Sequence, residues 1–325
     1  SPVAKSMRII GTGSARPSKV VTNSMLENFL DTSNEWIVTR TGIHERRVIS
    51  SENLEDLAAT AARNAMENAG ITSEDVDFII CSNVVNEYVT PGLGCVIQGM
   101  IGATCPTMDI NCACTGFIYA LDVAEAYLAT KKDMRNILIV CAEEPARMMN
   151  WHDRSSCILF GDAAGAVVVT KGDDLKAIRV STHCKVEALY QKRKLQPTPF
   201  ITKEEVDTEG VVMNGQDVFK LAVSSSIKDI DKVLTMAGMT ADEIDLYVLH
   251  QANVRIIESI RHFVNQDKSK FPFNLDRYGN TSSASIPALL DDLNRGNQLK
   301  TGEMLLLSAF GAGFTTGACI LRWSM

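Results

Sequence analysis

Two stretches of the chain repeat one another: residues 65–84, AMENAGITSEDVDFIICSNV, and residues 233–252, VLTMAGMTADEIDLYVLHQA. Each stretch predicts the end of a helix, an acidic turn, an aspartate and then an apolar strand. The predicted helices stop at Ala-Gly pairs whose glycines are Gly70 and Gly238. Glycine suits this place because a helix C-terminus often requires a positive φ. The repeat therefore predicts a duplicated α/β protein with two similar halves.

A second pair of segments repeats near the end of each half. Apolar strands are expected at residues 137–141 and 304–309, and each is followed by a Phe-Gly pair and another strand. We therefore expect one half in residues 1–170 and the other in residues 171–325. Short runs of Val, Ile and Leu alternate with helical patterns such as residues 54–69, which favours mixed sheets covered by helices.

The composition is that of an ordinary globular protein with a large core. The chain has 325 residues, of which 46% are hydrophobic and 22% charged. A net charge of −7 argues against nucleic-acid binding, and we expect no membrane contact because no apolar run reaches the roughly 18 residues of a span. The nine cysteines include no CxxC pair, so no metal site is expected. Their odd number and the lack of a signal peptide predict free thiols and a cytoplasmic location.

Cys114 is the first candidate for chemistry. It lies between an apolar strand that ends near Ile110 and a helix that begins near Thr115. Unpaired N–H groups and the helix dipole favour a thiolate at such a place, so we expect the pKa of Cys114 to lie below the usual value of about 8.5. The alternative is a buried structural cysteine, and position alone leaves both open.

Three other segments carry candidate site residues. His250 follows an apolar strand at residues 246–249, a placement typical of active sites in α/β folds. Asn280 lies in a run of small polar residues, which suits either a turn or a loop that lines a pocket. Residues 310–317, FGAGFTTG, form either a plain turn or a loop whose N–H groups face an oxyanion. They lack the Lys-Ser/Thr pair of a nucleotide-binding loop.

Together these segments resemble the 3-ketoacyl-ACP synthase III family of the thiolase superfamily. The resemblance runs from Ile9 to Trp323 and rests on seven motifs in the order that the family has them. The motifs are DTSNEWIVTRTGIHERR (31–47), CTGF (114–117), FGDAAGA (160–166), MNGQDVFK (213–220), HQAN (250–253), GNTSSASIP (279–287) and FGAGFTTG (310–317).

The resemblance implies a thiolase-like fold, in which two similar αβ halves pack mixed sheets around central helices, and it implies a homodimer. The implied activity is that of an acyltransferase that starts fatty-acid synthesis. Acyl-CoA would load Cys114, and malonyl-ACP would then lose CO₂ and condense to 3-ketoacyl-ACP. His250 and Asn280 would stabilise the enolate, while the backbone N–H groups of Cys114 and Ala312 would face the oxyanion. No cofactor is implied, because acyl-CoA is a substrate.

Binding residues also follow from the resemblance. Trp36 would stack on the adenine of coenzyme A, and Arg40 and Arg154 would meet its phosphates or base edges. Lys220 and Arg255 match positions where the family docks the acidic acyl carrier protein, and Arg261 is expected near Arg255 on the same helix. The alternative for all of these side chains is an ordinary solvated surface.

Three departures from the family pattern bear on specificity. Ala312 stands where glycine is common, and a positive φ there would cost more for alanine than for glycine. Thr90 stands where some members place a phenylalanine that caps the acyl tunnel of the partner subunit, so we expect a roomier tunnel that accepts starters longer than acetyl. Residues 183–200 are basic and lack the glycines expected there.

Two other functions stay open from the sequence. The first is an acyltransferase or priming ketosynthase of a specialised, polyketide-type pathway, which a requirement for malonyl-ACP would separate from the main interpretation. The second is a degenerate, non-catalytic dimer partner. Such subunits usually lack the nucleophile, whereas Cys114, His250 and Asn280 are all present here.

Overall fold

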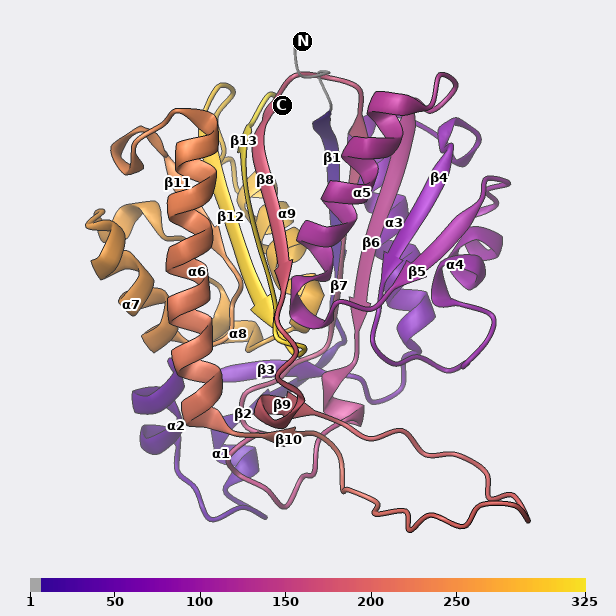
Figure 1. Ribbon diagram of the computed structural model, residues 1–325, viewed down its shortest axis with the longest axis vertical. Helices are drawn as coiled ribbons and strands as arrows, with labels where there is room; N and C mark the ends of the chain where they lie inside the picture. Colours follow the sequence, from indigo (N-terminus) through magenta and orange to yellow (C-terminus); the bar gives the residue numbers. More distant parts are fainter. Residues whose placement is uncertain (1–6) are drawn as a thin grey trace.

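Two mixed β-sheets form the centre of the computed structural model, which describes residues 7–325 (Figure 1). The strand orders are β1-β7-β6-β4-β5 and β11-β12-β13-β8. The first sheet contains β1 (Arg8–Ala15), β4 (Phe78–Ser82), β5 (Thr107–Ile110), β6 (Asn136–Glu143) and β7 (Ala163–Thr170). The second contains β8 (Leu175–Thr182), β11 (Leu246–Leu249), β12 (Met304–Gly311) and β13 (Thr315–Arg322).

The pairing of the strands repeats between the two sheets. In the first sheet β4 is parallel to β6, and β6 is antiparallel to β7. In the second sheet β11 is parallel to β12, and β12 is antiparallel to β13. All strands of the first sheet precede residue 171 and all strands of the second follow it. We infer from this that the two predicted halves, 1–170 and 171–325, are the repeating units over the described residues 7–170 and 171–325.

The ends of two long helices confirm the repeat at residue level. α3 (Leu54–Ala69) ends at Gly70 with φ 70°, and α6 (Gly215–Ala237) ends at Gly238 with φ 64°. A short 3-10 turn follows each glycine, and each turn begins with a threonine capping box. The predicted positive φ at both helix ends is therefore confirmed, and glycine is required there because a Cβ disfavours this conformation.

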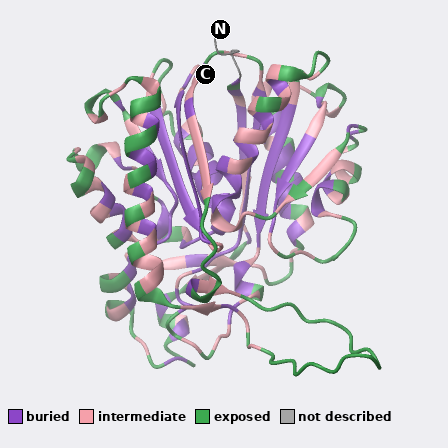
Figure 2. Cartoon of the chain, viewed as in Figure 1, coloured by how far each residue is buried: buried purple, intermediate pink, exposed green. Residues whose placement is uncertain are grey.

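Two helices lie between the sheets, as the family resemblance implied for the helix after Cys114. α5 (Gly116–Thr130) contacts β4 and β6 of one sheet and β8, β12 and β13 of the other, and α9 (Ser285–Arg295) contacts β1, β7 and β11. The inner strands β4, β6, β7, β12 and β13 are mainly buried, and so is α9. The edge strand β8 is only partly buried, and the outer helices expose one face (Figure 2). One large apolar cluster joins α5, α9 and both sheets, so the two halves share a core.

The remaining elements cover the sheets or form a lower layer below them in Figure 1. They are β2 (Lys19–Thr22), α1 (Asn23–Leu26), α2 (Asn34–Thr41), β3 (Glu45–Val48), α4 (Leu93–Ile101), β9 (Leu189–Tyr190), β10 (Val212–Met213), α7 (Val254–Val264) and α8 (Leu275–Tyr278). In the part of the chain that the structure describes, no helix is both long and apolar enough to cross a membrane.

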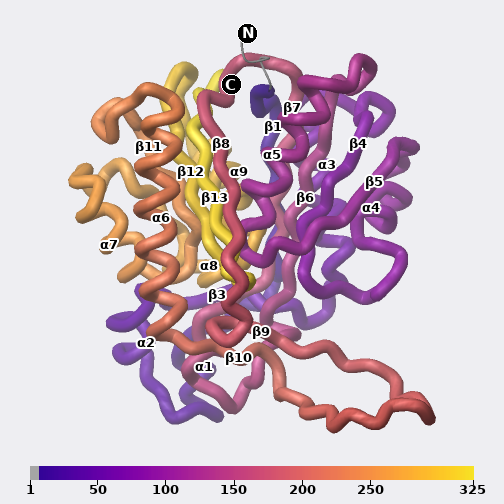
Figure 3. Tube along the Cα trace, in the orientation of Figure 1, coloured from indigo at the N-terminus to yellow at the C-terminus, as the bar shows by residue number. Residues whose placement is uncertain are grey.

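The basic segment noted in the sequence begins an arm that leaves the body of the protein. Residues 191–211 contain neither helix nor strand and are mostly exposed. The trace runs out and back between β9 and β10 (Figure 3). Because β9 and β10 pair with each other, the base of the arm is fixed while its length projects from the lower layer.

Candidate active site

The turn that carries Cys114 is shaped by close packing. Cys114 occupies a 3-10 turn, Ala113–Thr115, between β5 and α5, and Ala113 has a positive φ of 51°. Gly116 opens α5 against the side chain of Ser82, which leaves no room for a Cβ. Gly311, at the end of β12, is equally confined, because a Cβ there would lie 2.6 Å from the Cys114 amide nitrogen. Ser82 of the first half and Gly311 of the second therefore both pack closely against the turn.

The pKa of Cys114 differs from the prediction. Burial raises it to about 12, a hydrogen bond with Ser282 acts in the opposite direction, and the nearby Glu143 raises it further. The expectation of a lowered pKa was therefore wrong. It considered only the helix terminus, whereas distant segments enclose the thiol, and low polarity disfavours the thiolate. A group that accepts the thiol proton is thus needed for nucleophilic attack.

Residues 279–287, which we call the serine-rich segment, contain Asn280 and contact the other two predicted catalytic residues, Cys114 and His250. The Cys114 thiol donates to Ser282 Oγ at 3.4 Å. The backbone N–H of Ser282 donates to Asn280 Oδ1 at 2.8 Å. Ser285 Oγ lies 2.6 Å from His250 Nδ1. The segment thus joins the Cys114 turn of the first half to His250 in the second.

His250 is held as a neutral, oriented imidazole. It is 2% exposed, and burial lowers its pKa to about 3. Its ring meets Phe310 edge to face, with centroids 5.1 Å apart. Nε2 is buried and makes no hydrogen bond to any residue that the structure describes. Because a buried, unsatisfied nitrogen costs free energy, this atom is suited to a bond with a substrate.

Glu143 is a site residue that the sequence analysis missed. It ends β6 and is 2% exposed, and burial raises its pKa to about 7. Its Oε1 accepts from the Val84 N–H at 2.9 Å, and its Oε2 accepts from the hydroxyls of Ser282 and Ser283 at 2.7 and 3.1 Å. The available signal was its place at the end of a buried strand, the same signal that identified His250.

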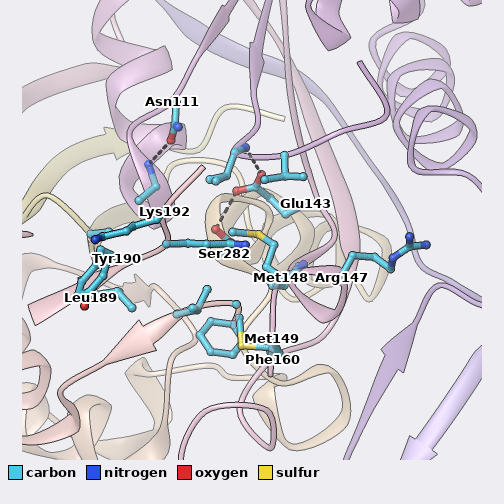
Figure 4. A pocket seen from close by; sticks show the side chains of 18 of the residues that line it. Asn111, Glu143, Arg147, Met148, Met149, Phe160, Leu189, Tyr190, Lys192 and Ser282 are labelled. Atoms are coloured by element: carbon cyan, nitrogen blue, oxygen red, sulfur yellow. Dashed lines mark hydrogen bonds between the residues drawn. The ribbon is translucent and has the colours of Figure 1, made fainter. Parts of the chain in front are cut away.

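A pocket of about 810 Å³ opens beside Cys114. Cys114, Glu143, Ser282 and Ala312 line it, and Figure 4 shows Glu143 and Ser282 pointing toward each other. Its apolar wall includes Met148, Met149, Phe160 and Leu189, while Arg147 and Lys192 also line it. Among the described lining residues His250 and Asn280 are absent, and both side chains are buried.

Trp36, Arg40 and Arg154 come together in a second cluster. The guanidinium carbon of Arg40 lies 4.5 Å from the centroid of the Trp36 ring, and that of Arg154 lies 4.9 Å from it. Arg154 also donates to the backbone oxygen of Asp31 at 2.6 Å. Two cations at a half-buried indole can hold a flat, anionic ligand by stacking and charge.

Comparison with known proteins identifies the family. Two family models of 3-oxoacyl-[acyl-carrier-protein] synthase III match the chain, one over residues 108–187 and the C-terminal one over residues 234–323. A beta-ketoacyl-[acyl-carrier-protein] synthase III of Clostridium acetobutylicum is 39% identical over 323 residues, which cover 98% of this chain and 99% of that protein. The chain belongs to the 3-oxoacyl-[acyl-carrier-protein] synthase III family.

Solved structures of synthase III proteins share the fold. The enzyme of Aquifex aeolicus superposes with a TM-score of 0.91 at 38% identity, over 98% of this chain and 100% of that one. A priming beta-ketosynthase from the R1128 polyketide biosynthetic pathway superposes with a TM-score of 0.92 at 30% identity, over 100% and 98% of the two chains. The predicted thiolase-like fold is therefore confirmed.

The structure shows where two departures from the synthase III pattern, Ala312 and Thr90, lie. Ala312 lines the pocket beside Cys114, and its φ is not positive, so the strain considered for alanine does not arise. The left-handed residues nearby are Ala113, Ser282 and Gly313. Thr90 is exposed and does not line the pocket of its own chain, as far as the described residues show.

The basic side chains predicted to dock the carrier protein of a synthase III lie on neighbouring helices. Lys220 is exposed on α6, and Arg255 is exposed on α7, which packs against α6. Arg255 donates to the backbone oxygen of Thr39 at 3.2 Å. Arg261 pairs with Glu258 at 2.7 Å on the same helix, so its charge is largely neutralised. Lys220 and Arg255 therefore remain the better candidates.

Proposed function

We propose that this protein starts fatty-acid synthesis by a decarboxylative Claisen condensation. An acyl group passes from acyl-CoA to Cys114, and condensation with malonyl-ACP gives 3-ketoacyl-ACP, CoA and CO₂. The main support is the serine-rich segment, which contacts Cys114 through Ser282, binds the Asn280 side chain and holds His250 through Ser285. Acyl-CoA is a substrate here, so the reaction requires no cofactor.

In the loading step, the sulfur of Cys114 attacks the thioester carbonyl. The tetrahedral oxyanion would accept from the backbone N–H groups of Cys114 and Ala312, which both line the pocket. A fixed N–H donor of this kind is worth about 10²- to 10³-fold in rate, because it needs no reorganisation when charge develops. The apolar wall would hold the acyl chain away from water.

In the condensing step, His250 and Asn280 would donate to the enolate oxygen. Ser285 can donate to His250 Nδ1, which leaves the proton of the neutral ring on the unsatisfied Nε2. Asn280 Oδ1 already accepts from the Ser282 N–H, which leaves the NH₂ group of its side chain as the donor. Two donors in a dry site stabilise the charge that appears as CO₂ departs. The carbanion then attacks the acyl group on Cys114.

The partners follow from the same assignment. The cluster of Trp36, Arg40 and Arg154 would hold the nucleotide end of coenzyme A, and the exposed cations Lys220 and Arg255 would meet the acyl carrier protein. We also propose a cytoplasmic homodimer in which Thr90 faces the acyl tunnel of the partner subunit. No nucleic-acid or membrane partner is part of this proposal.

A second candidate is the priming step of a polyketide-type pathway. The observation that favours it is the 30% identity and TM-score of 0.92 to the R1128 priming beta-ketosynthase. The chemistry on Cys114 is shared, so the two candidates differ in the starter acyl group and in the carrier that accepts it.

The test is intact-mass spectrometry with a panel of acyl-CoAs, followed by addition of malonyl-ACP. We expect a mass gain of one acyl group that is lost in Cys114→Ala but kept in Cys112→Ala, a matched change two residues away. Addition of malonyl-ACP should then release 3-ketoacyl-ACP. Loading without condensation would indicate a specialised acyltransferase. No loading from any CoA would overturn the proposal and leave Cys114 a structural residue.

A further inference from the structure

A chain of hydrogen bonds leads from the nucleophile to a buried carboxylate. The thiol of Cys114 donates to Ser282 Oγ at 3.4 Å, and the hydroxyl of Ser282 donates to Glu143 Oε2 at 2.7 Å. Figure 4 shows the second bond at the wall of the pocket. The direction is the same in both bonds, so each donor points one step nearer the carboxylate.

We propose that Glu143, acting through Ser282, accepts the proton of Cys114 during acyl loading and returns it to the departing CoA. This deepens the proposed function and rests on it. As the new bond between Cys114 sulfur and the acyl carbon forms, the thiol proton passes to Ser282 Oγ and the Ser282 proton passes to Glu143 Oε2. The bond between the acyl carbon and the CoA sulfur then breaks. Glu143 returns its proton to Ser282 Oγ, and the Ser282 hydroxyl passes its own proton to the CoA sulfur, which gives CoA-SH. No electron acceptor or second reactant is required.

The geometry of Ser282 supports a role beyond packing. Its φ is 56°, the left-handed conformation, which is costly for a residue with a Cβ. The bonds from its N–H to Asn280 and from its hydroxyl to Glu143 hold it there. Such strained residues persist only where the surroundings fix them, and they cluster at functional sites. The conformation places one hydroxyl against both the thiol and the carboxylate.

The surroundings of Glu143 suit a proton acceptor that works near neutral pH. Its pKa of about 7 is raised mainly by burial, while the bonds from Ser282, Val84 and Ser283 act in the opposite direction. The titratable groups that interact with it include the thiols of Cys114, Cys81 on β4 and Cys141 on β6, and the cations Arg147 and Lys192 line the same pocket. Burial raises the pKa of Cys81 and Cys141, so both stay protonated and neutral. Glu143 also forms no salt bridge with any described residue.

His250 is a poorer acceptor for the same proton. Its Nδ1 is engaged with Ser285, and its pKa is about 3 because the ring is buried. Burial instead raises the pKa of Glu143 to about 7, so the carboxylate binds a proton more tightly than the imidazole does. This difference separates the two roles: Glu143 moves a proton in the loading step, and His250 stays neutral as a donor in the condensing step.

The test is the single-turnover rate of acylation by acyl-CoA between about pH 5.5 and 9.5, followed by quenching and intact-mass analysis. In the unmodified protein the rate should rise with an apparent pKa near 7. Glu143→Gln should lose this rise, and its rate near pH 7 should fall about 10²- to 10³-fold. Glu143→Asp, which keeps a carboxylate, should recover part of the rate and the pH profile.

Glu144→Gln is the matched control. Glu144 is the next residue and half-buried, its pKa is also raised to about 7, and burial is again the main cause. It lies outside the relay from Cys114 through Ser282, so we expect the acylation rate and its pH profile to stay unchanged. Thermal unfolding of each variant shows whether the fold is kept. If Glu143→Gln does not fold, Ser282→Ala provides the same test. It interrupts the relay at its middle, so it should also lose the rise of the acylation rate with pH.

The outcomes distinguish this proposal from the general function. A Glu143→Gln variant with an unchanged pH profile overturns the relay, whether its rate is normal or uniformly lower, yet leaves acyl loading on Cys114 intact. Failure of the unmodified protein to load would instead overturn the proposed function. As a further readout, Glu143→Gln loaded by long incubation should condense with malonyl-ACP at a normal rate. A parallel loss of condensation would show a structural role and contradict the relay.

Discussion

Gly311 and the amide nitrogen of Cys114 are so close that a Cβ on Gly311 would lie 2.6 Å from that nitrogen. The contact joins the end of β12, in the second half of the chain, to the nucleophile turn of the first. The direction of the Cys114 N–H therefore depends on a residue from the other half of the sequence.

Gly311→Ala should displace the nucleophile turn. We expect acylation to slow by about 10²-fold, since the oxyanion would lose one well-placed donor. The added methyl group should also lower the free energy of unfolding by about 1–3 kcal/mol through overpacking. Gly215→Ala is the control, because no atom lies within 4 Å of a Cβ there. Equal acylation rates in both variants would contradict the role of this contact.

Ser285→Ala should affect condensation and spare loading. The variant removes the hydroxyl that lies 2.6 Å from His250 Nδ1, so the ring loses its fixed orientation and tautomer. We expect decarboxylation of malonyl-ACP by the acylated protein to slow about 10-fold or more, since small misplacements of reacting groups are costly. Acylation by acyl-CoA should stay unchanged. An equal loss in both steps would show that Ser285 supports the whole site rather than His250.

Trp36→Ala should weaken the use of acyl-CoA through its nucleotide. Stacking of a base on an aromatic ring contributes about 1–3 kcal/mol, which corresponds to a rise in KM of about 5- to 150-fold. An acyl-pantetheine substrate lacks adenine and serves as the control. Its KM should be the same in the variant as in the unmodified protein. A similar rise for both substrates would remove Trp36 from the nucleotide site.

The buried His250 should make stability depend on acid pH. Its pKa in the folded protein is about 3, below the ordinary value of 6.5, so the unfolded chain binds a proton first. The stability contribution is present above pH 6.5 and is lost as the pH falls from 6.5 toward 3. The difference in unfolding free energy between the unmodified protein and His250→Asn should therefore shrink by up to about 1.4 kcal/mol per pH unit. A constant difference in urea denaturation from about pH 8 to 4.5 would contradict this.

Thr90→Phe should shift the preference toward short starters. Thr90 is exposed, and we propose that it faces the acyl tunnel of the partner subunit. A phenylalanine there would fill space that longer acyl chains need, and each excluded methylene is worth about 1–3 kcal/mol in discrimination. Thr90→Val, which has nearly the same volume, should keep the original profile across an acyl-CoA panel. A strict acetyl preference in the unmodified protein would remove the basis of the prediction.

The sequence predicted well those features that depend only on a few neighbouring residues. The Ala-Gly helix ends at Gly70 and Gly238 depend on one local φ, so their pattern predicted their geometry. The central position of α5 followed from the family resemblance and is confirmed by its contacts with both sheets. The positions of His250 and Asn280 at the ends of elements were likewise visible in the order of apolar and polar residues.

The features that sequence predicted poorly arise from contacts between distant segments. The pKa of Cys114 depends on burial, which the second half of the chain completes, so the helix terminus alone gave the wrong direction. Glu143 gains its importance from Ser282, which lies 139 residues away. No short window of sequence contains both, so the only sequence signal for Glu143 was its place at the end of a buried strand.

The left-handed residues Ala113 and Ser282 occupy corresponding places in the two halves. Each opens a three-residue 3-10 turn, Ala113–Thr115 or Ser282–Ala284, and each turn leads directly into a central helix. The two turns are thus duplicated structural elements, and they pack against each other. One copy supplies the thiol and the other supplies the hydroxyls beside it. Duplication has in this way given one turn two different roles, and the proposed site requires residues from both halves.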